Sequence, residues 1–207
     1  MEQVLDVYTR PYNPDVPLIC MDEKPVQLLE DARLALPMKA GQVRREDYEY
    51  ERKGTCSLFL FTEPLAGWRL VHARSQRTKR DWALEIQELL DLHYPQARRV
   101  CLVLDNLNTH TLASLYEAFV PATARALASR LELCYTPKHG SWLNMAEVEL
   151  SALTLQCLDR RIGSMDDLQR EVSAWARQRN EACKTLSWQF TTEDARIRLK
   201  HLYPQFD

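Results

Sequence analysis

The sequence has 207 residues, of which 45% are hydrophobic and 27% charged, and its formal net charge is −2. This length suits one domain with a sizeable core, and the mixture of charges excludes a disordered or fibrous chain. No apolar run approaches the roughly 20 residues that cross a bilayer, and residues 1–15 lack the basic and apolar segments of a signal peptide. We therefore expect a cytoplasmic protein. The pI near 6.2 argues against a dedicated DNA-binding domain, whose pI usually exceeds about 9.

Six cysteines raise the question of a metal cluster or of disulfides. They are widely spaced and include no C-x-x-C pair, which argues against both. Four lie in or beside apolar runs, where a reduced cysteine packs as a small hydrophobic side chain: Cys20, Cys56, Cys101 and Cys134. We expect these four cysteines to be core residues.

The first predicted elements are a short helix and a buried strand. Residues 1–9 suit a helix, which the prolines at 11, 14 and 17 bring to an end. Residues 16–22 (VPLICMD) are a short apolar run and predict a buried strand that ends in a carboxylate, Asp22. Residues 24–53 are mixed and charged, and we assign no element to them.

A hairpin and an amphipathic helix are predicted next. Residues 56–74 contain two apolar strands around a turn with Pro64 and Gly67. Residues 78–94 repeat apolar side chains at helical spacing, which predicts an amphipathic helix.

The rest of the chain alternates predicted strands with helices. Residues 98–105 (RRVCLVLD) predict a second buried strand that ends in a carboxylate, and residues 131–136 predict a third. Helices are expected over 111–120, over 125–130 and, in two or three pieces, over 142–202. Strands that form a meander first and then alternate with helices predict an α/β fold with a mixed central sheet flanked by helices.

Two of the predicted strands end in an aspartate, Asp22 and Asp105. Either residue alone could cap a turn. If the strands are neighbours about 4.8 Å apart, the carboxylates approach within about 4 Å and repel each other by roughly 4 kcal/mol at an effective dielectric constant of about 20. Such a pair must share a proton or bind a cation. An all-oxygen site of this kind suits Mg²⁺ or Mn²⁺.

A third acid can come from the helix that begins near Trp142. An apolar stripe at helical spacing runs along this helix, formed by Leu143, Ala146, Leu150, Leu153 and Cys157. Glu147 lies within the stripe, one turn after Asn144, and an acid there is costly unless it is paired or binds metal. The alternative is an acid that merely favours the positive helix N-terminus. Glu149 falls on a flank, so it is the weaker candidate, and we expect Glu149→Gln to be nearly neutral for activity and stability.

Three motifs stand in order along the chain: MDE (21–23), LDNLNTH (104–110) and YTPKHGSWLNMAEVE (135–149). Together with the segment REDYEYERKGT (45–55) and the hairpin after it, they resemble bacterial insertion-sequence transposases of the mariner superfamily. The resemblance covers nearly the whole chain, and three ordered motifs are a far more specific signal than any one of them.

The resemblance implies an RNase H-like fold and metal-dependent cleavage of DNA. It assigns Asp22, Asp105 and Glu147 as the catalytic acids that hold two Mg²⁺ or Mn²⁺ ions. It also implies cutting at the ends of a mobile element and strand transfer into target DNA, commonly at a TA dinucleotide. A homodimer is expected in the active complex, acting at the bacterial nucleoid.

Two features depart from that family. The sequence places 41 residues between Asp105 and Glu147, more than in many mariner relatives, and we expect the extra length within residues 117–130. The family carries helix-turn-helix DNA-binding modules before the catalytic domain, and no such module is recognisable here. We expect one upstream or in a partner chain, so that these 207 residues alone bind DNA weakly, without sequence preference and in a salt-sensitive way.

Several other residues have expected roles near the acids. Asn106, His110 and Asn144 belong to the matching motifs, and His110 either supports a metal ligand, positions a phosphate or is a hydrogen-bonded histidine at a helix start. Lys138 lies on the loop before the helix of Glu147 and is a candidate phosphate contact. Glu23 should point away from Asp22 along an extended segment, so we leave it out of the site.

Basic residues cluster in two places, near Lys138–His139 and in a first group formed by Arg69, Arg74, Arg77, Lys79 and Arg80. Such residues either contact DNA phosphates or are solvated surface. Trp142 is expected to pack under its loop rather than stack on a base.

We expect three segments along the chain: a linker helix over 1–15, the catalytic domain over 16–163 and a helical extension over 164–207 packed on the same domain. Two alternatives to a transposase stay open. One is a regulatory transposase fragment without catalysis, and the other is a different RNase H-like nuclease, such as a junction resolvase or an RNA–DNA hybrid nuclease.

Overall fold

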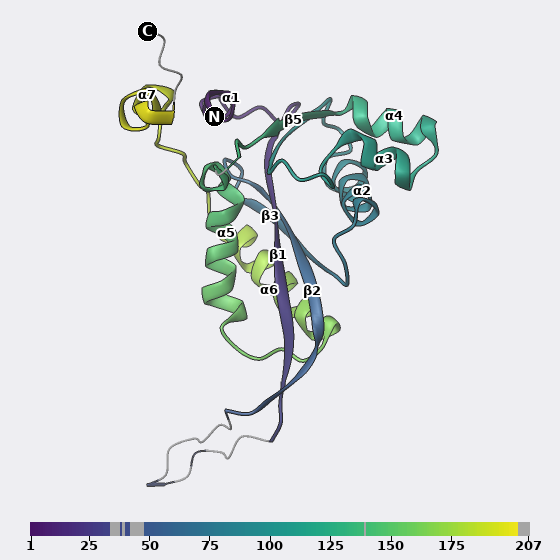
Figure 1. Ribbon diagram of the computed structural model, residues 1–207, viewed down its shortest axis with the longest axis vertical. Helices are drawn as coiled ribbons and strands as arrows, with labels where there is room; N and C mark the ends of the chain where they lie inside the picture. The colour runs from purple at the N-terminus through teal and green to yellow at the C-terminus, as the bar shows by residue number, and fades with distance from the viewer. Residues whose placement is uncertain (34–37, 39, 42–47, 139, 203–207) are drawn as a thin grey trace.

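Five strands form one mixed sheet (Figure 1): β1 (Leu18–Asp31), β2 (Tyr50–Glu63), β3 (Trp68–Arg74), β4 (Val100–Leu104) and β5 (Leu131–Tyr135). The structure, a computed structural model, describes residues 1–33, 38, 40–41, 48–138 and 140–202. The strand order is β3-β2-β1-β4-β5, with β1, β2 and β3 antiparallel and β1, β4 and β5 parallel. This arrangement confirms the predicted α/β fold with a mixed, RNase H-like sheet.

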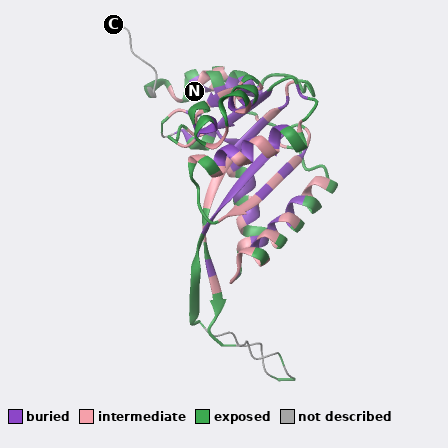
Figure 2. Cartoon of the chain, turned by 90° about the vertical axis from the view of Figure 1, so that its right-hand side faces the viewer, coloured by how far each residue is buried: buried purple, intermediate pink, exposed green. Residues whose placement is uncertain are grey.

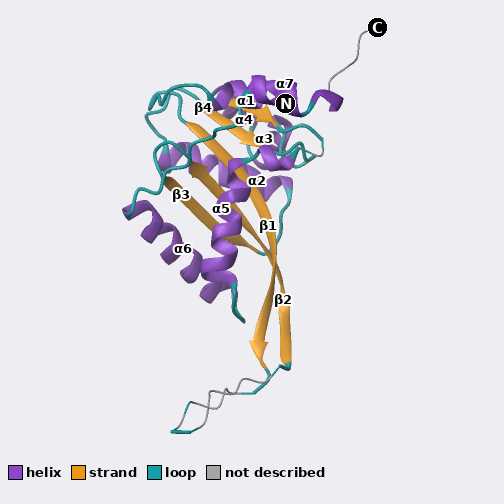
Figure 3. Ribbon diagram, turned by 90° about the vertical axis from the view of Figure 1, so that its left-hand side faces the viewer, coloured by secondary structure: helices purple, strands orange, loops and turns teal. Residues whose placement is uncertain are grey.

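Helices cover both faces of the sheet (Figures 1 and 3). One face carries α5 (Met145–Leu153) and α6 (Met165–Glu181), and the other carries α2 (Lys79–Glu88), α3 (Leu112–Ala118) and α4 (Pro121–Ser129). Near one end of the sheet, α1 (Glu2–Tyr8) lies beside α7 (Thr192–Arg198). Short 3-10 or π-helical turns are η1 (Leu89–His93), η2 (Ser141–Leu143), η3 (Thr154–Leu158) and η4 (Lys200–Leu202).

Side chains alternate between the two faces along each strand, so each face has its own apolar core. In β1, Cys20 belongs to the core on the side of α5 and α6. Its neighbours Ile19 and Met21 belong to the core on the side of α2, α3 and α4. Buried residues concentrate where both helical layers cover the strands, and the outer part of the β1–β2 hairpin is exposed (Figure 2). The same alternation determines which layer of helices a polar side chain faces at the point where the buried part of a strand ends.

β1 is longer than the sequence predicts. We expected a strand that ends at Asp22, but β1 continues to Asp31 and pairs with β2 over that length. The part of β1 beyond Asp22 and the β2 residues paired with it project from the domain, and we call this pair of segments the arm (Figures 1 and 3). Most of the β1 residues in the arm are half-buried or exposed. An apolar alternation marks a strand only where one face is buried, so the charged arm carried no strand signal. Of the segment 45–55, residues 45–47 lie outside the described residues and Tyr50 begins β2.

The predicted helices form with adjusted ends. Thr78 caps α2 by accepting a hydrogen bond from the Asp81 N–H, and the predicted helix ends as the π-helical turn η1. The helix expected over 125–130 begins earlier, at Pro121, which is the first helical residue of α4, where its missing N–H costs nothing. Residues 117–130, where we expected the extra length, thus hold the end of α3 and all of α4, on the face away from α5.

β3 is an edge strand, and amide side chains of α6 occupy its outer backbone groups. Asn180 Oδ1 accepts from the Arg69 N–H at 2.8 Å, and Asn180 Nδ2 donates to the Arg69 carbonyl oxygen at 2.9 Å. Further along, Gln169 Oε1 accepts from the Ala73 N–H at 2.7 Å and its Nε2 donates to the Val71 carbonyl oxygen at 3.1 Å. The edge is therefore satisfied by a helix instead of a further strand. In this way α6 packs on the sheet, while a domain boundary at residue 163 stays a prediction.

The cysteines are free thiols. The four that lie in strands are buried, which confirms that they pack as core residues: Cys20, Cys56, Cys101 and Cys134. Among the described residues, no helix is both long and apolar enough to span a membrane.

The turn between β2 and β3 depends on a glycine. Gly67 has φ +67°, and a Cβ there would lie 2.8 Å from the backbone carbonyl carbon of Cys183. We expect Gly67→Ala to lower the free energy of unfolding by about 1–3 kcal/mol, because both the backbone conformation and the contact oppose a side chain. Urea unfolding measures the change. Gly41→Ala is the matched control, since Gly41 has φ +76° and nothing within 4 Å of its Cβ position. Equal losses for the two variants would contradict the role of the Cys183 contact.

Candidate active site

The strand register brings Asp22 and Asp105 level with each other. β1 and β4 pair in parallel, with Cys20 opposite Val103. Asp22 and Asp105 each lie two residues further along, so the same register places them side by side. Because Cys20 and Val103 both face α5 and α6, the alternation turns both aspartates toward that face as well.

Both aspartates line an open cavity of about 760 Å³ to which α5 also contributes. The residues that carry the argument are Asp22, Asp105, Asn144 and Glu147, and the other lining residues are Glu23, Lys24, Pro25, Ser141, Leu150, Ser151, Thr154 and Leu155. Glu147 lies in the first turn of α5 and is half-buried. The structure thus brings together the three acids that the sequence singled out, from two neighbouring strands and the helix that faces them.

The start of α5 is tied to β1 and α1. Asn144 Nδ2 donates to the Met21 carbonyl oxygen at 2.8 Å, and Asn144 Oδ1 caps the helix by accepting from the Ala146 N–H at 3.1 Å. The Tyr8 hydroxyl of α1 donates to the Leu143 carbonyl oxygen at 2.7 Å. Asn144 therefore links the strand beside Asp22 directly to the helix that carries the third acid.

The negative charges in the cavity are poorly compensated by protein groups. Burial raises the pKa of Asp22 to about 6; the Glu23 N–H, which donates to Asp22 Oδ1 at 2.7 Å, opposes this shift, whereas the carboxylates of Asp105 and Glu147 add to it. Carboxylates in this state suit a cation.

His110 lies behind Asp105, fully buried, and bridges it to Glu23. Its Nδ1 is 2.6 Å from Asp105 Oδ1 and 3.2 Å from the Asp105 carbonyl oxygen, and its Nε2 is 3.0 Å from Glu23 Oε1. Burial lowers the pKa of His110, but the hydrogen bonds and charges of Asp105 and Glu23 outweigh it and raise the pKa to about 9. His110 is therefore a cation that supports Asp105.

Glu23 was left out of the predicted site, yet it is part of this support. It points away from Asp22, as expected, but the layer that it faces contains His110. Arg77 Nη1 lies 4.0 Å from Glu23 Oε2, so the chain of charges continues to an exposed arginine. The alternation along β1 was the available signal, but only the fold shows what lies opposite Glu23.

The remaining predicted residues do not converge on the acids. Asn106 and Lys138 are exposed on the loops after β4 and β5, and His139 lies outside the described residues. Trp142 packs edge-on against Phe190 at 5.8 Å between ring centroids and 43% of the residue is exposed, so packing under its own loop stays a prediction.

The basic cluster at residues 69–80 is not one surface patch. Arg69 is buried, Arg74 donates to Glu85 and Lys79 pairs with Glu117. Arg80 is exposed, and Arg77 lies 4.0 Å from Glu23. The expectation of a shared phosphate-binding or solvated surface is therefore wrong for Arg69, because its guanidinium is fully enclosed.

The predicted flank position of Glu149 is also wrong. Its side chain is fully buried and pairs with Arg69, 2.7 Å away, and with Arg179 at 3.1 Å. Burial alone raises the pKa of Glu149, but the hydrogen bonds and charges of the two arginines hold it below its usual value. The apolar stripe of α5 is buried as predicted, but a helical wheel cannot reveal that α6 and β3 cover the helix on another side. The expected neutrality of Glu149→Gln for stability does not follow from this structure.

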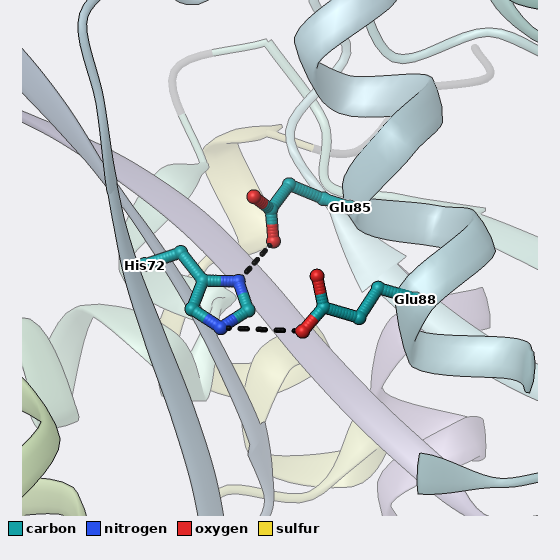
Figure 4. Close-up of side chains that lie close together, drawn as sticks. All are labelled: His72, Glu85 and Glu88. Carbon is teal, nitrogen blue, oxygen red and sulfur yellow. Dashed lines mark hydrogen bonds and ion pairs between the residues drawn. The ribbon is translucent and has the colours of Figure 1, made fainter. Parts of the chain in front are cut away.

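A second group of metal-ligand side chains lies outside the cavity, between β3 and α2 (Figure 4). His72 Nδ1 is 2.7 Å from Glu85 Oε2, and His72 Nε2 is 3.5 Å from Glu88 Oε1. Burial lowers the pKa of His72, but the hydrogen bond and charge of Glu85 raise it above its usual value. Arg74 Nε donates to the other oxygen of the buried Glu85 at 2.6 Å. Glu85 is thus already paired on both oxygens, and the group is an ion-paired link between sheet and helix.

Comparison with known proteins gives a consistent family and fold. The family model for the DDE superfamily endonuclease matches residues 17–169. The structure is similar to the Mos1 mariner transposase in its paired-end complex with Mn (TM-score 0.57, 16% identity, 88% of this chain and 56% of that chain). It is similar to the Mos1 strand transfer complex (TM-score 0.57, 16% identity, 89% and 60%). It also matches the isolated Mos1 catalytic domain (TM-score 0.54, 13% identity, 87% and 86%).

At these identities the structural similarity establishes the RNase H-like fold and nothing finer. The chain spans little more than half the length of the transposase chains in the DNA complexes. No curated protein matches its sequence.

The raised pKa of Asp22 predicts a pH-dependent cost in the metal-free protein. The folded-state pKa of about 6 lies above the ordinary value of 3.8. Between these two pH values the folded state binds more protons than the unfolded state, so the free energy of unfolding falls as the pH rises from the lower value to the higher. We therefore expect Asp22→Asn to stabilise the chelated protein near pH 7 and to change it little near pH 4, as measured by urea unfolding. Asp15→Asn, at an exposed position, is the control. If Asp22→Asn differs from wild type in unfolding free energy by the same amount at both pH values, the raised pKa of Asp22 is not the cause of the difference.

Proposed function

This chain belongs to the DDE superfamily endonucleases, and we propose that it is the catalytic domain of a transposase, which cleaves DNA and joins the cut end to a target. The observation that carries the proposal is the convergence of Asp22, Asp105 and Glu147 on one open cavity. Similarity in fold to the Mos1 mariner catalytic domain supports it. The three acids are the proposed catalytic residues.

The acids fit a pair of Mg²⁺ or Mn²⁺ ions. The donor set is all oxygen, as these ions prefer. The pKa of Asp22 is raised by burial and by its acidic neighbours, as expected where carboxylates crowd together without a bound cation. Two divalent ions, when bound, would activate the attacking oxygen, first of water and then of a 3′-hydroxyl, and stabilise the leaving oxygen.

The protein groups around the acids hold them in place. Asp22 is fixed through the Glu23 N–H, and Asp105 through the His110 imidazole. Glu147 is placed by the capped start of α5, which Asn144 anchors to β1. Asp22 and Asp105 would lie between or beside the ions, and Glu147 would complete the set of ligands.

DNA contacts would come from basic residues at the rim of the cavity. Lys24 lines the cavity, and Arg77 lies close to Glu23. Lys138 and Asn106, on the exposed loops nearby, are further candidates for phosphate contacts. With a net charge of −2, these few residues would provide little affinity for duplex DNA.

The partners follow from the same proposal. The substrates would be the ends of a bacterial insertion sequence and a target DNA, bound by a homodimer at the nucleoid. Specific recognition would reside in a helix-turn-helix region upstream or in a partner chain.

Divalent ions should stabilise the folded chain. A ligand that binds only the folded state adds about 2.7 kcal/mol at a concentration 100 times its Kd, so Mg²⁺ or Mn²⁺ should raise the Tm in thermal unfolding. Asp105→Asn should remove this shift. His72→Gln, in the ion-paired group between β3 and α2, is the matched control and should retain it. If His72→Gln loses the Tm shift and Asp105→Asn keeps it, the metal binds at His72, Glu85 and Glu88 and not at the proposed site.

Activity should depend on all three acids. With the upstream region restored, we expect Asp22→Asn, Asp105→Asn and Glu147→Gln each to reduce strand cleavage by more than about 100-fold without unfolding the chain, because each removes a metal-binding charge. Glu117→Gln, at an exposed ion pair on α3, should leave cleavage unchanged. The assay measures cutting and joining of the element's own ends in Mg²⁺ or Mn²⁺.

The same assay separates the alternatives. Full cleavage in excess chelator would contradict the metal site. Cutting of four-way junctions or RNA–DNA hybrids without strand joining would indicate another RNase H-like nuclease. Absence of any nuclease activity with an intact fold would favour a regulatory fragment.

A further inference from the structure

α5 carries acids on two different sides. Glu147 faces the cavity, whereas Glu149, two residues later, is buried on another side of the helix. At about 100° per residue, the two side chains diverge by roughly 200° around the helix axis. A single quantity, the rotation of α5 about its axis, therefore sets the direction of both the Glu147 and the Glu149 carboxylates.

Glu149 is held by two arginines. Arg69 Nη2 donates to Glu149 Oε1 at 2.7 Å. Arg179 makes a two-pronged contact, in which Nε donates to Oε2 and Nη2 donates to Oε1, each at 3.1 Å. Both carboxylate oxygens are therefore engaged, and we refer to Arg69, Glu149 and Arg179 as the Glu149 cluster.

Arg69 is itself fixed to the rest of the fold. Its side chain is fully buried, its Nη1 donates to the Gly67 carbonyl oxygen at 2.7 Å, and its Nη2 also donates to the Lys184 carbonyl oxygen. Its backbone is hydrogen-bonded to Asn180, which follows Arg179 in α6. The Glu149 cluster thus joins α5 to the edge strand, to the turn before it and to α6.

The buried apolar stripe limits the rotation of α5, a nine-residue helix, but leaves it less precisely set, because hydrophobic contact is non-directional. A two-pronged arginine–carboxylate contact is directional. Buried ion pairs add little net stability compared with apolar side chains of similar volume. The benefit of burying this cluster is therefore in orientation more than in stability.

We propose that the Glu149 cluster sets the rotation of α5 and thereby turns the Glu147 carboxylate toward Asp22 and Asp105. Asn144 fixes one end of the helix to β1, and the cluster fixes its middle from the opposite side. Arg69, Glu149 and Arg179 are positioning residues: they act on the metal site through α5. The orientation of α5 by the cluster does not depend on the proposed function, but the expected effect on metal binding rests on it.

The test uses a substitution that keeps charge and loses geometry. Arg179→Lys retains a cation beside Glu149 but removes the two-pronged contact, and the side chain at 179 is 19% exposed, so the variant should fold. We expect Mn²⁺ affinity, measured by electron paramagnetic resonance on the whole chain, to fall by about tenfold, the loss typical when partners that orient metal ligands are removed. The urea midpoint should stay close to that of wild type. Arg177→Lys, at an exposed position on the same helix, is the matched control and should change neither quantity.

A double substitution removes the buried charges together. Arg69→Met with Glu149→Leu removes the two fully buried charges and leaves Arg179, whose side chain is 19% exposed and can turn toward solvent, so the variant should keep the fold, as apolar replacements of buried ion pairs commonly do. The proposal predicts that this variant also loses Mn²⁺ affinity and cleaves more slowly. Wild-type Mn²⁺ affinity in both this variant and Arg179→Lys would overturn the positioning role.

A measurement without metal tests the orientation of α5 independently of the proposed function. Hydrogen exchange of the α5 amides should be faster in Arg179→Lys than in wild type, while exchange in α2 stays the same. Failure of the wild-type chain to bind Mn²⁺ would refute the metal site but not this change in α5. Unchanged exchange in α5 would refute the orientation by the cluster even if the metal site is real.

Discussion

The parallel pairing of β1 with β4 is the constraint on which the site depends. The register that sets Cys20 opposite Val103 brings two carboxylates level on one face of the sheet. Bringing like charges together is unfavourable unless something offsets it. The compensation within the protein is partial: His110 supports Asp105 from behind, while the cavity itself holds acids from three elements. A fold that assembles charges at this cost provides a place whose charge and oxygen atoms suit a cation.

Patterns that depend on burial were predictable from the sequence. The apolar runs before Asp22 and Asp105 predicted the two inner strands, and the apolar stripe from Leu143 to Cys157 predicted the helix of Glu147, although α5 begins at Met145 and not near Trp142. The arm of β1 was missed because strand pairing there is not accompanied by burial, so its residues carry no apolar alternation. The resemblance also predicted that Asp22, Asp105 and Glu147 act together, and the strand register shows how the two aspartates come level.

The residues that were misassigned all have partners far away in the sequence. Glu149 faces arginines from β3 and α6, and Glu23 faces a histidine beyond β4. A helical or strand periodicity assigns a side chain to a face, but it does not name the layer packed on that face. In both cases a charged residue that seemed to belong to solvent is enclosed, because the opposite charge arrives from an element that the local pattern cannot anticipate.

The way in which α6 closes the edge of the sheet limits how copies of this chain can associate. An exposed edge strand can accept a strand from a neighbouring molecule. Here the N–H groups of Arg69 and Ala73 and the carbonyl oxygens of Arg69 and Val71 are already bonded to Asn180 and Gln169, so a strand cannot pair at these positions unless α6 first comes away. Misassembly through that edge is therefore coupled to local unfolding of α6, and the same bonds that hold the helix in place also protect the protein against aggregation from that side.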